Sequence, residues 1–336
     1  MQQISVIVPC FNEERNIGSL VNSVINSSGF IKGQDEIIIA DDCSTDGSRE
    51  AAAKAGAQVV GLAENSGPAA ARNLGVASAK NEILLFLDSD TLLEPGSLEA
   101  VKKRFSVQGD DIDIVNGLCE PDPINPTLGS YYKGLVEYSW HLDAIAKGTV
   151  PTIFNSRVGA IRKDVFNRTG GFDTAIRGAE LEEHEFSYRL PKGTRFKLCP
   201  ELRVRHDFPD MMNTIKVYWK RSAKWAELFF EHKQFDNGGC VGGTSMLNAL
   251  GHLSGIWACL FLLMSVSGSM YWLSASGITF FLFAAINRMF FSMAFQKSLL
   301  LGMGLVFLHL LYSFVILGGA IWGGFRLLRA KLSVKL

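Results

Sequence analysis

Two carboxylates stand one residue apart at the end of an apolar run. The segment NEILLFLDSDT places Asp88 and Asp90 directly after five apolar residues, 83–87. Both can reach one divalent cation if the chain turns after a strand, and hard oxygen ligands suit Mg²⁺ or Mn²⁺. Such a cation would neutralise a diphosphate and stabilise it as a leaving group. The alternative is that Asp90 caps a helix in the segment that follows it.

More polar residues end other apolar runs. Asp41 and Asp42 end the run DEIIIADD, and Asn12 and Glu13 follow the run ISVIVP. In a doubly wound sheet the carboxyl ends of the strands form the ligand-binding edge. The four aspartates at this edge repel one another and cost stability unless a cation is present. This favours the cation site over the helix cap.

The elements that must position these residues alternate regularly. Short β-branched runs are typical of strands buried on both faces, and the stretches between them repeat apolar residues at helical spacing. The expected strands are 4–9, 35–42, 57–63 and 82–90, and the expected helices are 13–27, 48–56 and 67–79. This alternation predicts a doubly wound α/β sheet.

Charged residues are distributed unevenly along the chain. Lysine plus arginine (33) equal aspartate plus glutamate (33), without the basic excess of a nucleic-acid binder, so we expect no nucleic-acid partner. No acidic residue follows Asp236, and the remainder has the composition of a membrane region. The N-terminus lacks a signal-peptide pattern and the six cysteines lack CxxC spacing, so we expect the soluble part in the cytoplasm.

Three apolar stretches occupy the C-terminal third, at 247–267, 270–286 and 299–325. A span needs about 20 apolar residues, so we expect two or three transmembrane helices within 247–326 and a multi-pass protein of the inner membrane. Hydropathy favours three spans, although they would place the basic tail, 327–336, outside, against the positive-inside rule. Two spans would keep the tail inside, with the middle stretch interfacial or re-entrant.

A basic, aromatic helix at about 213–232 and a Gly-rich joint at 237–246 precede these stretches. The helix has the make-up of an interfacial helix and suggests a partner at the lipid bilayer, a lipid-linked or membrane-proximal acceptor.

Six motifs together resemble the family 2 glycosyltransferases of the GT-A fold. They are, in order, VIVPCFNEE, IIIADDCSTDGS, NSGPAAARNLG, LLFLDSDT, GGFD and ELEEHEFSYRL. Each is weak alone, but the series keeps the family's order and spacing. The resemblance implies a GT-A-type mixed sheet, the nucleotide-diphospho-sugar transferase fold, over residues 1–236, on the cytosolic side of the membrane.

The resemblance also implies roles at matching positions. The nucleotide-sugar-binding positions are Pro9, Asn12, Glu13, Asp42, Ser44, Asp46, Arg72, Asn73, Asp88 and Ser89. The metal ligands are Asp90, Asp88 and His206, and the cofactor is Mn²⁺ or Mg²⁺. Simpler roles stay open: Arg72 only pairs with an acidic neighbour, Asp41 only orders its turn, and His206 is structural.

The family's general base falls in ELEEHEF. Relatives usually carry Glu-Asp here, whereas this chain has Glu182 and Glu183, so Glu183 takes the position of the base. Glutamate is one methylene longer, and a misplaced base can cost orders of magnitude in rate. The cluster of Glu180, Glu182, Glu183 and Glu185 could instead be a solvated helix start, favoured by the helix dipole.

The segment WKRSAKW resembles a degraded Q-x-x-R-W signature of processive synthases, with Arg221 first and Lys224 and Trp225 last. The missing Gln favours transfer of a single sugar, and a membrane-surface helix is an equal alternative.

The resemblance predicts an inverting, metal-dependent transferase with a nucleotide-sugar donor, expected to be UDP-linked. Two rivals remain. LLFLDSDTLL also matches the DxDxT signature of haloacid dehalogenase-like phosphatases, with Asp88 as nucleophile, but it lies on the fourth strand and no GDxxxD follows. A catalytically dead nucleotide-sugar binder fits the Glu183 departure. No GxGxxG or GxxxxGK[ST] is present.

Overall fold

The computed structural model describes residues 2–107, 111–175, 182–232 and 245–333. These residues form two compact units, which we describe separately. The sheet unit comprises the described residues up to 124 and residues 144–207, and the helical unit comprises 125–143, 208–232 and 245–333. The expected joint at 237–246 lies outside the described residues up to position 244, and the expected boundary at residue 236 stays a prediction.

The sheet unit is built on one mixed sheet with the strand order β3-β2-β1-β4-β7-β6-β8-β5. Its strands are β1 (Ile4–Cys10), β2 (Glu36–Asp41), β3 (Gln58–Gly61), β4 (Ile83–Leu87), β5 (Thr91–Leu93), β6 (Ile114–Cys119), β7 (Val158–Arg162) and β8 (Phe196–His206). The first four are parallel, whereas β7 runs antiparallel to β4 and β6. The predicted mixed α/β sheet is confirmed.

Helices fill the connections of this unit. They are α1 (Ile17–Ile25), α2 (Ser48–Ala55), α3 (Pro68–Ser78), α4 (Ser97–Ser106), α6 (Lys163–Thr169) and α7 (Glu182–Tyr188). α3 lies very close to the sheet, because a Cβ at Gly75 would come within 2.6 Å of Ile7 Cγ2. This close packing fixes Arg72 and Asn73, one turn earlier on α3.

An aromatic cluster ties the sheet to α7. Phe86 of β4 packs edge-on against Phe154 and Phe172, with ring centroids 5.5 and 6.0 Å away. Phe186 of α7 lies 4.7 Å from the ring of Phe172, which belongs to the GGFD segment. All four side chains are buried. The cluster therefore holds α7, the helix that carries Glu182 and Glu183, against the sheet.

The helical unit contains the apolar part of the chain. Its helices are α5 (Leu128–Lys147, most of which lies in this unit), α8 (Met211–His232), α9 (Ser245–Met264), α10 (Met270–Ile286), α11 (Arg288–Lys297) and α12 (Leu299–Ser333). By length and composition two segments could cross a membrane, Leu247–Ser267 and Leu299–Arg329. α10 and α11 would make a third if this pair, bent by 81°, were one span.

Candidate active site

Asp88 and Asp90 lie in the turn between β4 and β5. Thr91, the first residue of β5, donates its hydroxyl to the backbone carbonyl of Asp88 at 2.7 Å. A strand follows Asp90, and the next helix, α4, begins only at Ser97 with Gly96 as its N-cap. The alternative of Asp90 as a helix cap is therefore wrong.

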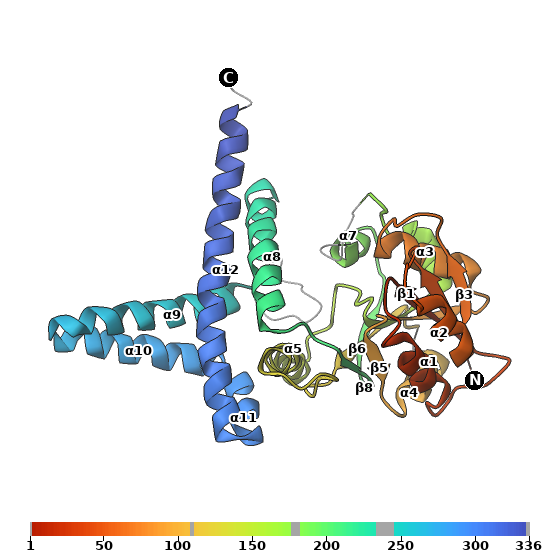
Figure 1. The fold of residues 1–336 in the computed structure, drawn as a ribbon, viewed down its shortest axis with the longest axis horizontal. Coiled ribbons are helices and arrows are strands. Elements are labelled where there is room, and N and C mark those ends of the chain that lie inside the picture. The colour runs from red at the N-terminus through yellow and green to blue at the C-terminus, as the bar shows by residue number, and fades with distance from the viewer. Residues whose placement is uncertain (1, 108–110, 176–181, 233–244, 334–336) are drawn as a thin grey trace. The chain divides into compact units, whose positions relative to one another are not determined.

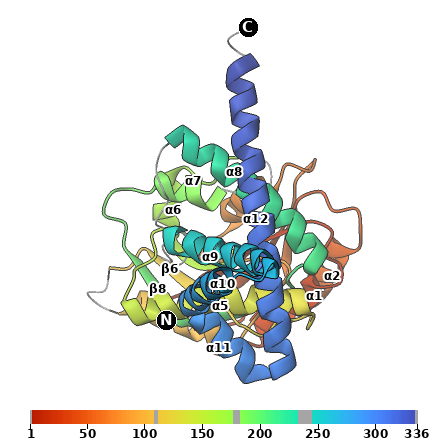
Figure 2. The same ribbon diagram turned by 90° about the vertical axis from the view of Figure 1, so that its left-hand side faces the viewer.

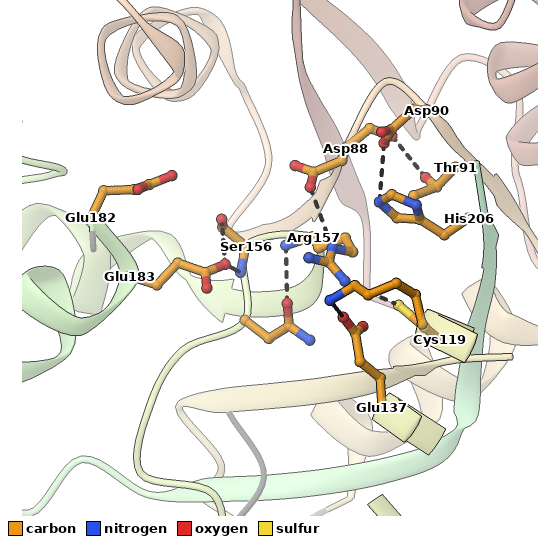
Figure 3. Close-up of polar contacts among 12 residues, drawn as sticks. Asp88, Asp90, Thr91, Cys119, Glu137, Ser156, Arg157, Glu182, Glu183 and His206 are labelled. Atoms are coloured by element: carbon orange, nitrogen blue, oxygen red, sulfur yellow. Dashed lines mark hydrogen bonds and ion pairs between the residues drawn. The ribbon is translucent and has the colours of Figure 1, made fainter. Parts of the chain in front are cut away.

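The antiparallel pairing of β5 with β8 brings His206 to the same turn. His206 lies opposite Thr91 in the register, and the backbone N–H of Asp207 donates to the carbonyl of Asp90 at 2.9 Å. The His206 Nε2 atom is 3.4 Å from Asp90 Oδ1. One ligand atom from each of Asp88, Asp90 and His206 lies within 4.8 Å of the other two (Figure 3).

The electrostatics of this cluster fit a divalent cation. Burial, and after it the neighbouring charge of Asp88, raise the pKa of Asp90 from 3.8 to about 7, against the opposing effect of Arg157. The two carboxylates are therefore strained as a pair of anions. Carboxylate oxygens suit Mn²⁺ and Mg²⁺, an imidazole can complete such a set, and a cation here would remove the repulsion. The predicted ligands are thus brought together.

Arg72 connects the cation ligands with α7. Its guanidinium is buried, donates to Asp88 Oδ1 at 2.9 Å and to Glu182 Oε1 at 3.2 Å, and lies 5.6 Å over the ring of Phe172. The pKa of Glu182 is raised by burial, and Arg72 opposes that rise. Arg72 thus has the acidic partners of the simpler interpretation, and one of them is a predicted metal ligand.

Glu183 points from the first turn of α7 towards the segment before β7 (Figure 3). Its Oε1 atom accepts two hydrogen bonds from Ser156, one from the backbone N–H at 2.6 Å and one from the hydroxyl at 2.7 Å. Ser156 is buried. Glu183 is therefore held in one orientation and is not part of a solvated helix start; Glu180 lies outside the described residues.

Ser156 and Arg157 belong to the site although no sequence motif indicated them. Arg157 places its Nε atom 3.6 Å from Asp88 Oδ2, and its backbone carbonyl accepts the N–H of Asp88 at 3.3 Å. Both contacts follow from the antiparallel register of β7 with β4, in which Val158 lies opposite Leu87. The apolar run VGAIR was the available signal, because its pairing with β4 places the residue before it beside Asp88.

Hydrogen bonds link the loop after β1 to the loop after β2. Asn12 has a left-handed backbone (φ 56°), its N–H donates to Ser44 Oγ at 2.9 Å, and its Oδ1 accepts the N–H of Thr45 at 2.9 Å. Asp46 accepts the backbone N–H of Glu14 at 3.2 Å. Burial raises the pKa of Glu13, and the charge of Glu13 contributes to the raised pKa of Asp90.

Asp41 and Asp42 both order backbone. Asp41 accepts the N–H of Ser44 at 3.0 Å and pairs with Arg49 at 2.6 Å, so the structure gives it the turn-ordering role. Asp42 accepts the N–H groups of Ser66 and Gly67 at 2.7 and 2.8 Å. It thereby fixes the entry to α3, next to the β2 end where the nucleotide is expected.

The structure also places three other residues that are predicted to bind the nucleotide sugar. Asn73 makes two hydrogen bonds with the backbone of Phe172, at 2.8 and 2.9 Å, which fasten the GGFD segment to α3. Pro9 is buried within β1 and pairs with Ala40. Ser89 is partly buried between the two metal-ligand aspartates. The roles of these residues towards a nucleotide sugar stay predictions.

Comparison with known proteins identifies the domain. Residues 5–167 match the model of Glycosyl transferase family 2. A protein of Haemophilus influenzae described as an uncharacterized glycosyltransferase is 28% identical over 206 residues, 58% of this chain and 65% of that protein. An undecaprenyl-phosphate 4-deoxy-4-formamido-L-arabinose transferase of Aeromonas hydrophila is 33% identical over 115 residues, 32% of this chain and 35% of that protein. The chain thus spans less than two thirds of these relatives.

A solved structure extends the likeness to the whole fold. The mannosyltransferase PcManGT from Pyrobaculum calidifontis, in complex with GDP-Man and Mn²⁺, superposes with a TM-score of 0.61 at 17% identity, covering 96% of this chain and 87% of that chain. Residues 5–167 are therefore a family 2 glycosyltransferase domain, and the sheet has the GT-A architecture. The phosphatase interpretation of Asp88 is replaced by this result.

Proposed function

We propose that the protein transfers a sugar from a nucleotide-diphosphate sugar to a membrane-associated or lipid-linked acceptor, with inversion at the anomeric carbon and with a divalent cation. The observation that carries the proposal is the cluster of Asp88, Asp90 and His206 at the end of β4 in a family 2 domain. The Mn²⁺ and GDP-Man of the neighbour with the same fold support this class of donor. We expect a UDP-linked sugar, with GDP as the second candidate.

Acidic and basic side chains of the site have different roles towards the nucleotide-sugar donor. A bound Mn²⁺ or Mg²⁺, held by Asp88, Asp90 and His206, would neutralise the diphosphate leaving group. Arg72 orients Asp88 from the buried side, and Arg157 adds positive charge from the other side. The loops after β1 and β2, with Asn12, Ser44 and Asp46, border the place of the base and ribose.

Glu183 accepts the proton of the acceptor hydroxyl as that hydroxyl attacks the anomeric carbon from the face opposite the nucleotide. A general base must be positioned, and the two hydrogen bonds from Ser156 position this one. They offset the extra methylene by which Glu183 differs from the aspartate usual in the family. A single base without a covalent nucleophile gives inversion of configuration.

The acceptor is inferred from the helical unit. Its apolar helices suit a lipid bilayer, and an undecaprenyl-phosphate transferase is among the relatives. We place the protein in the inner membrane, with the sheet unit in the cytoplasm, where nucleotide sugars are made. A need for Glu183 favours an acceptor hydroxyl, as on a glycolipid, because a polyprenyl phosphate is already ionised and needs no base.

A turnover assay tests the proposal. Detergent-purified protein is incubated with UDP- and GDP-linked sugars, Mn²⁺, and either a polyprenyl phosphate or a short glycolipid. We expect release of one nucleotide that requires both Mn²⁺ and a lipid acceptor. Activity on soluble acceptors alone would contradict the lipid acceptor. Metal-dependent donor binding without transfer to any acceptor would instead identify a catalytically dead binder.

A further inference from the structure

The helical unit exposes apolar side chains in two places. One is the hairpin of α9 and α10 with its connecting turn, Ser245–Ile286, which we call the apolar hairpin. The other is α12. Figure 1 shows the apolar hairpin extending sideways from α12, and in Figure 2, turned by 90°, the hairpin points at the viewer while α12 is still seen along its length. The two elements therefore lie across each other.

Only one of these elements can cross a given bilayer. Transmembrane helices are tilted by about 20° on average from the membrane normal. If the apolar hairpin crosses the bilayer, α12 lies along the membrane plane. If α12 crosses the bilayer, the hairpin lies along the membrane plane. The neighbours of α12 decide between these arrangements.

α12 packs along its middle against charged helices. On α8, Met211 accepts a hydrogen bond from Tyr312 with its carbonyl, and Trp219 covers Gly318, where a Cβ would come within 2.7 Å of its ring. On α5, Lys133 pairs with Glu137 at 2.8 Å and lies 5.2 Å over the ring of Tyr218, which packs on Tyr312.

A span needs about 20 residues, so any span within Leu299–Arg329 includes the segment from Tyr312 to Gly318. It would bring Lys133, Glu137 and the exposed Lys216 into or against the hydrocarbon, at about 2.5–3.5 kcal/mol for each charge. α12 as a whole, at about 1.5 Å per residue, is also much longer than the hydrocarbon is thick.

Among the described residues, no charged helix packs along the outer part of the apolar hairpin. It carries no Asp, Glu, Lys or Arg. α9 has 20 residues and α10 has 17, both within the range of about 17–25 that spans a bilayer. Its large exposed side chains are apolar on both helices, including Trp257, Leu263, Ile278 and Phe281.

The two ends of the apolar hairpin differ as the ends of a membrane insert should. The far end is the turn SVSGS, followed by Tyr271, which is 87% exposed, and Trp272. The near end holds His252, whose ring bonds Ser313 of α12 at 2.8 Å, and Asn287 and Arg288 follow α10. Aromatic residues and polar turns belong at membrane–water interfaces.

We propose that the apolar hairpin is the membrane-spanning element and that α12 lies with α8 and α5 at the bilayer surface. The chain then crosses twice, and its basic C-terminal end, with Arg326 and Arg329, stays on the side of the sheet unit, in agreement with the positive-inside rule. Phe307, Phe314, Ile321 and Phe325 form an exposed apolar stripe on α12 that faces the acyl boundary. The three spans favoured by hydropathy are the alternative that the experiment below tests.

The test measures on which side of a sealed membrane four positions lie. In full-length protein with its six cysteines changed to serine, Lys54→Cys reports the side of the sheet unit, Ser267→Cys the far end of the hairpin, Gln296→Cys the exposed end of α11 between α10 and α12, and Arg329→Cys the end of α12. Each is labelled with a membrane-impermeant maleimide in sealed vesicles, before and after detergent. Accessibility of a C-terminal epitope tag to protease on the otherwise unchanged chain covers the case in which the cysteine-free protein does not fold.

We expect Gln296→Cys, Arg329→Cys and the epitope tag to be accessible from the same side as Lys54→Cys, and Ser267→Cys only from the opposite side. Labelling of position 296 or of position 329 from the opposite side would show that α12 crosses and would overturn the proposal. Labelling of position 267 from the same side as position 54 would show that the hairpin does not cross, and would overturn it as well.

Discussion

The sheet unit and the helical unit are each incomplete by themselves, but in different ways. In the sheet unit, buried charges have partners almost everywhere: Asp35 pairs with Lys102, and Arg72 pairs with Glu182. Asp90 differs from these residues, because burial, and after it the neighbouring charge of Asp88, raise its pKa. In the helical unit, charge is scarce and apolar area is left exposed. The first deficit indicates a cation and a charged donor, and the second indicates a lipid bilayer.

We expect the largest loss of activity from a substitution of the general base, Glu183. Glu183→Gln keeps the shape of the side chain and removes its ability to accept a proton, so we expect kcat with a hydroxyl acceptor to fall by about 10²–10⁴-fold. Donor affinity, measured by titration, should stay within a few-fold of wild type.

Ser156→Ala is the matched comparison for that variant. It keeps the carboxylate and the backbone N–H but removes the hydroxyl that orients Glu183. Its kcat should lie between those of wild type and Glu183→Gln, with an unchanged KM for the donor. Equal activity of Glu183→Gln and wild type with a glycolipid acceptor would contradict the role of Glu183.

The buried ion pairs of the sheet unit can be broken by a substitution of Arg72. Arg72→Met leaves Glu182 buried without its cation, and breaking a buried pair costs about 3–5 kcal/mol. The control is Arg168→Met, which removes an exposed pair with Asp164 that is worth at most about 0.5 kcal/mol. Chemical denaturation of both variants measures the difference, and equal losses of stability would contradict the distinction.

The packing of the helical unit can be broken at a glycine. A Cβ at Gly323 of α12 would overlap the backbone carbonyl of Ala223 on α8, so Gly323→Ala should lose about 1–3 kcal/mol although alanine is the better helix former. Gly277→Ala on α10 meets no atom within 4 Å and should be neutral or stabilising. Thermal melting in detergent compares them, and a lower Tm for Gly277→Ala than for Gly323→Ala would contradict the α8–α12 contact.

A smaller effect, which depends on pH, tests the raised pKa of Asp90. Because the pKa of Asp90 is raised to about 7, the folded metal-free protein holds this proton more tightly than the unfolded chain. Its contribution to stability is therefore present below pH 4 and is lost as the pH rises through 7. The Tm difference between Asp90→Asn and wild type should grow from pH 5 to pH 8, and Mn²⁺ should raise the Tm of wild type more at pH 8. A Tm difference independent of pH would contradict the raised pKa.

The sequence predicted what depends on short segments. The strands that end at Asp41 and Leu87, and the two carboxylates after β4, follow from apolar runs and their polar ends. Ser156 and Arg157 were missed because their contacts depend on the register of β7 with β4, which no local pattern specifies. The partners of Arg72 were equally hidden, since Glu182 is far away in sequence. The contact of α8 with α12 was hidden for a related reason, since nothing in either segment alone indicates that Trp219 packs on the glycines of α12.

The central claim is that Asp88, Asp90 and His206 hold a cation that binds a nucleotide diphosphate. Isothermal titration of the detergent-purified protein with UDP, GDP and CMP, each with and without Mn²⁺, tests it directly when wild type is compared with Asp90→Ala. The account predicts tight binding of one nucleotide that requires Mn²⁺ and is lost in the variant. Binding that is the same without Mn²⁺ or in Asp90→Ala, or no binding of any nucleotide, would contradict it.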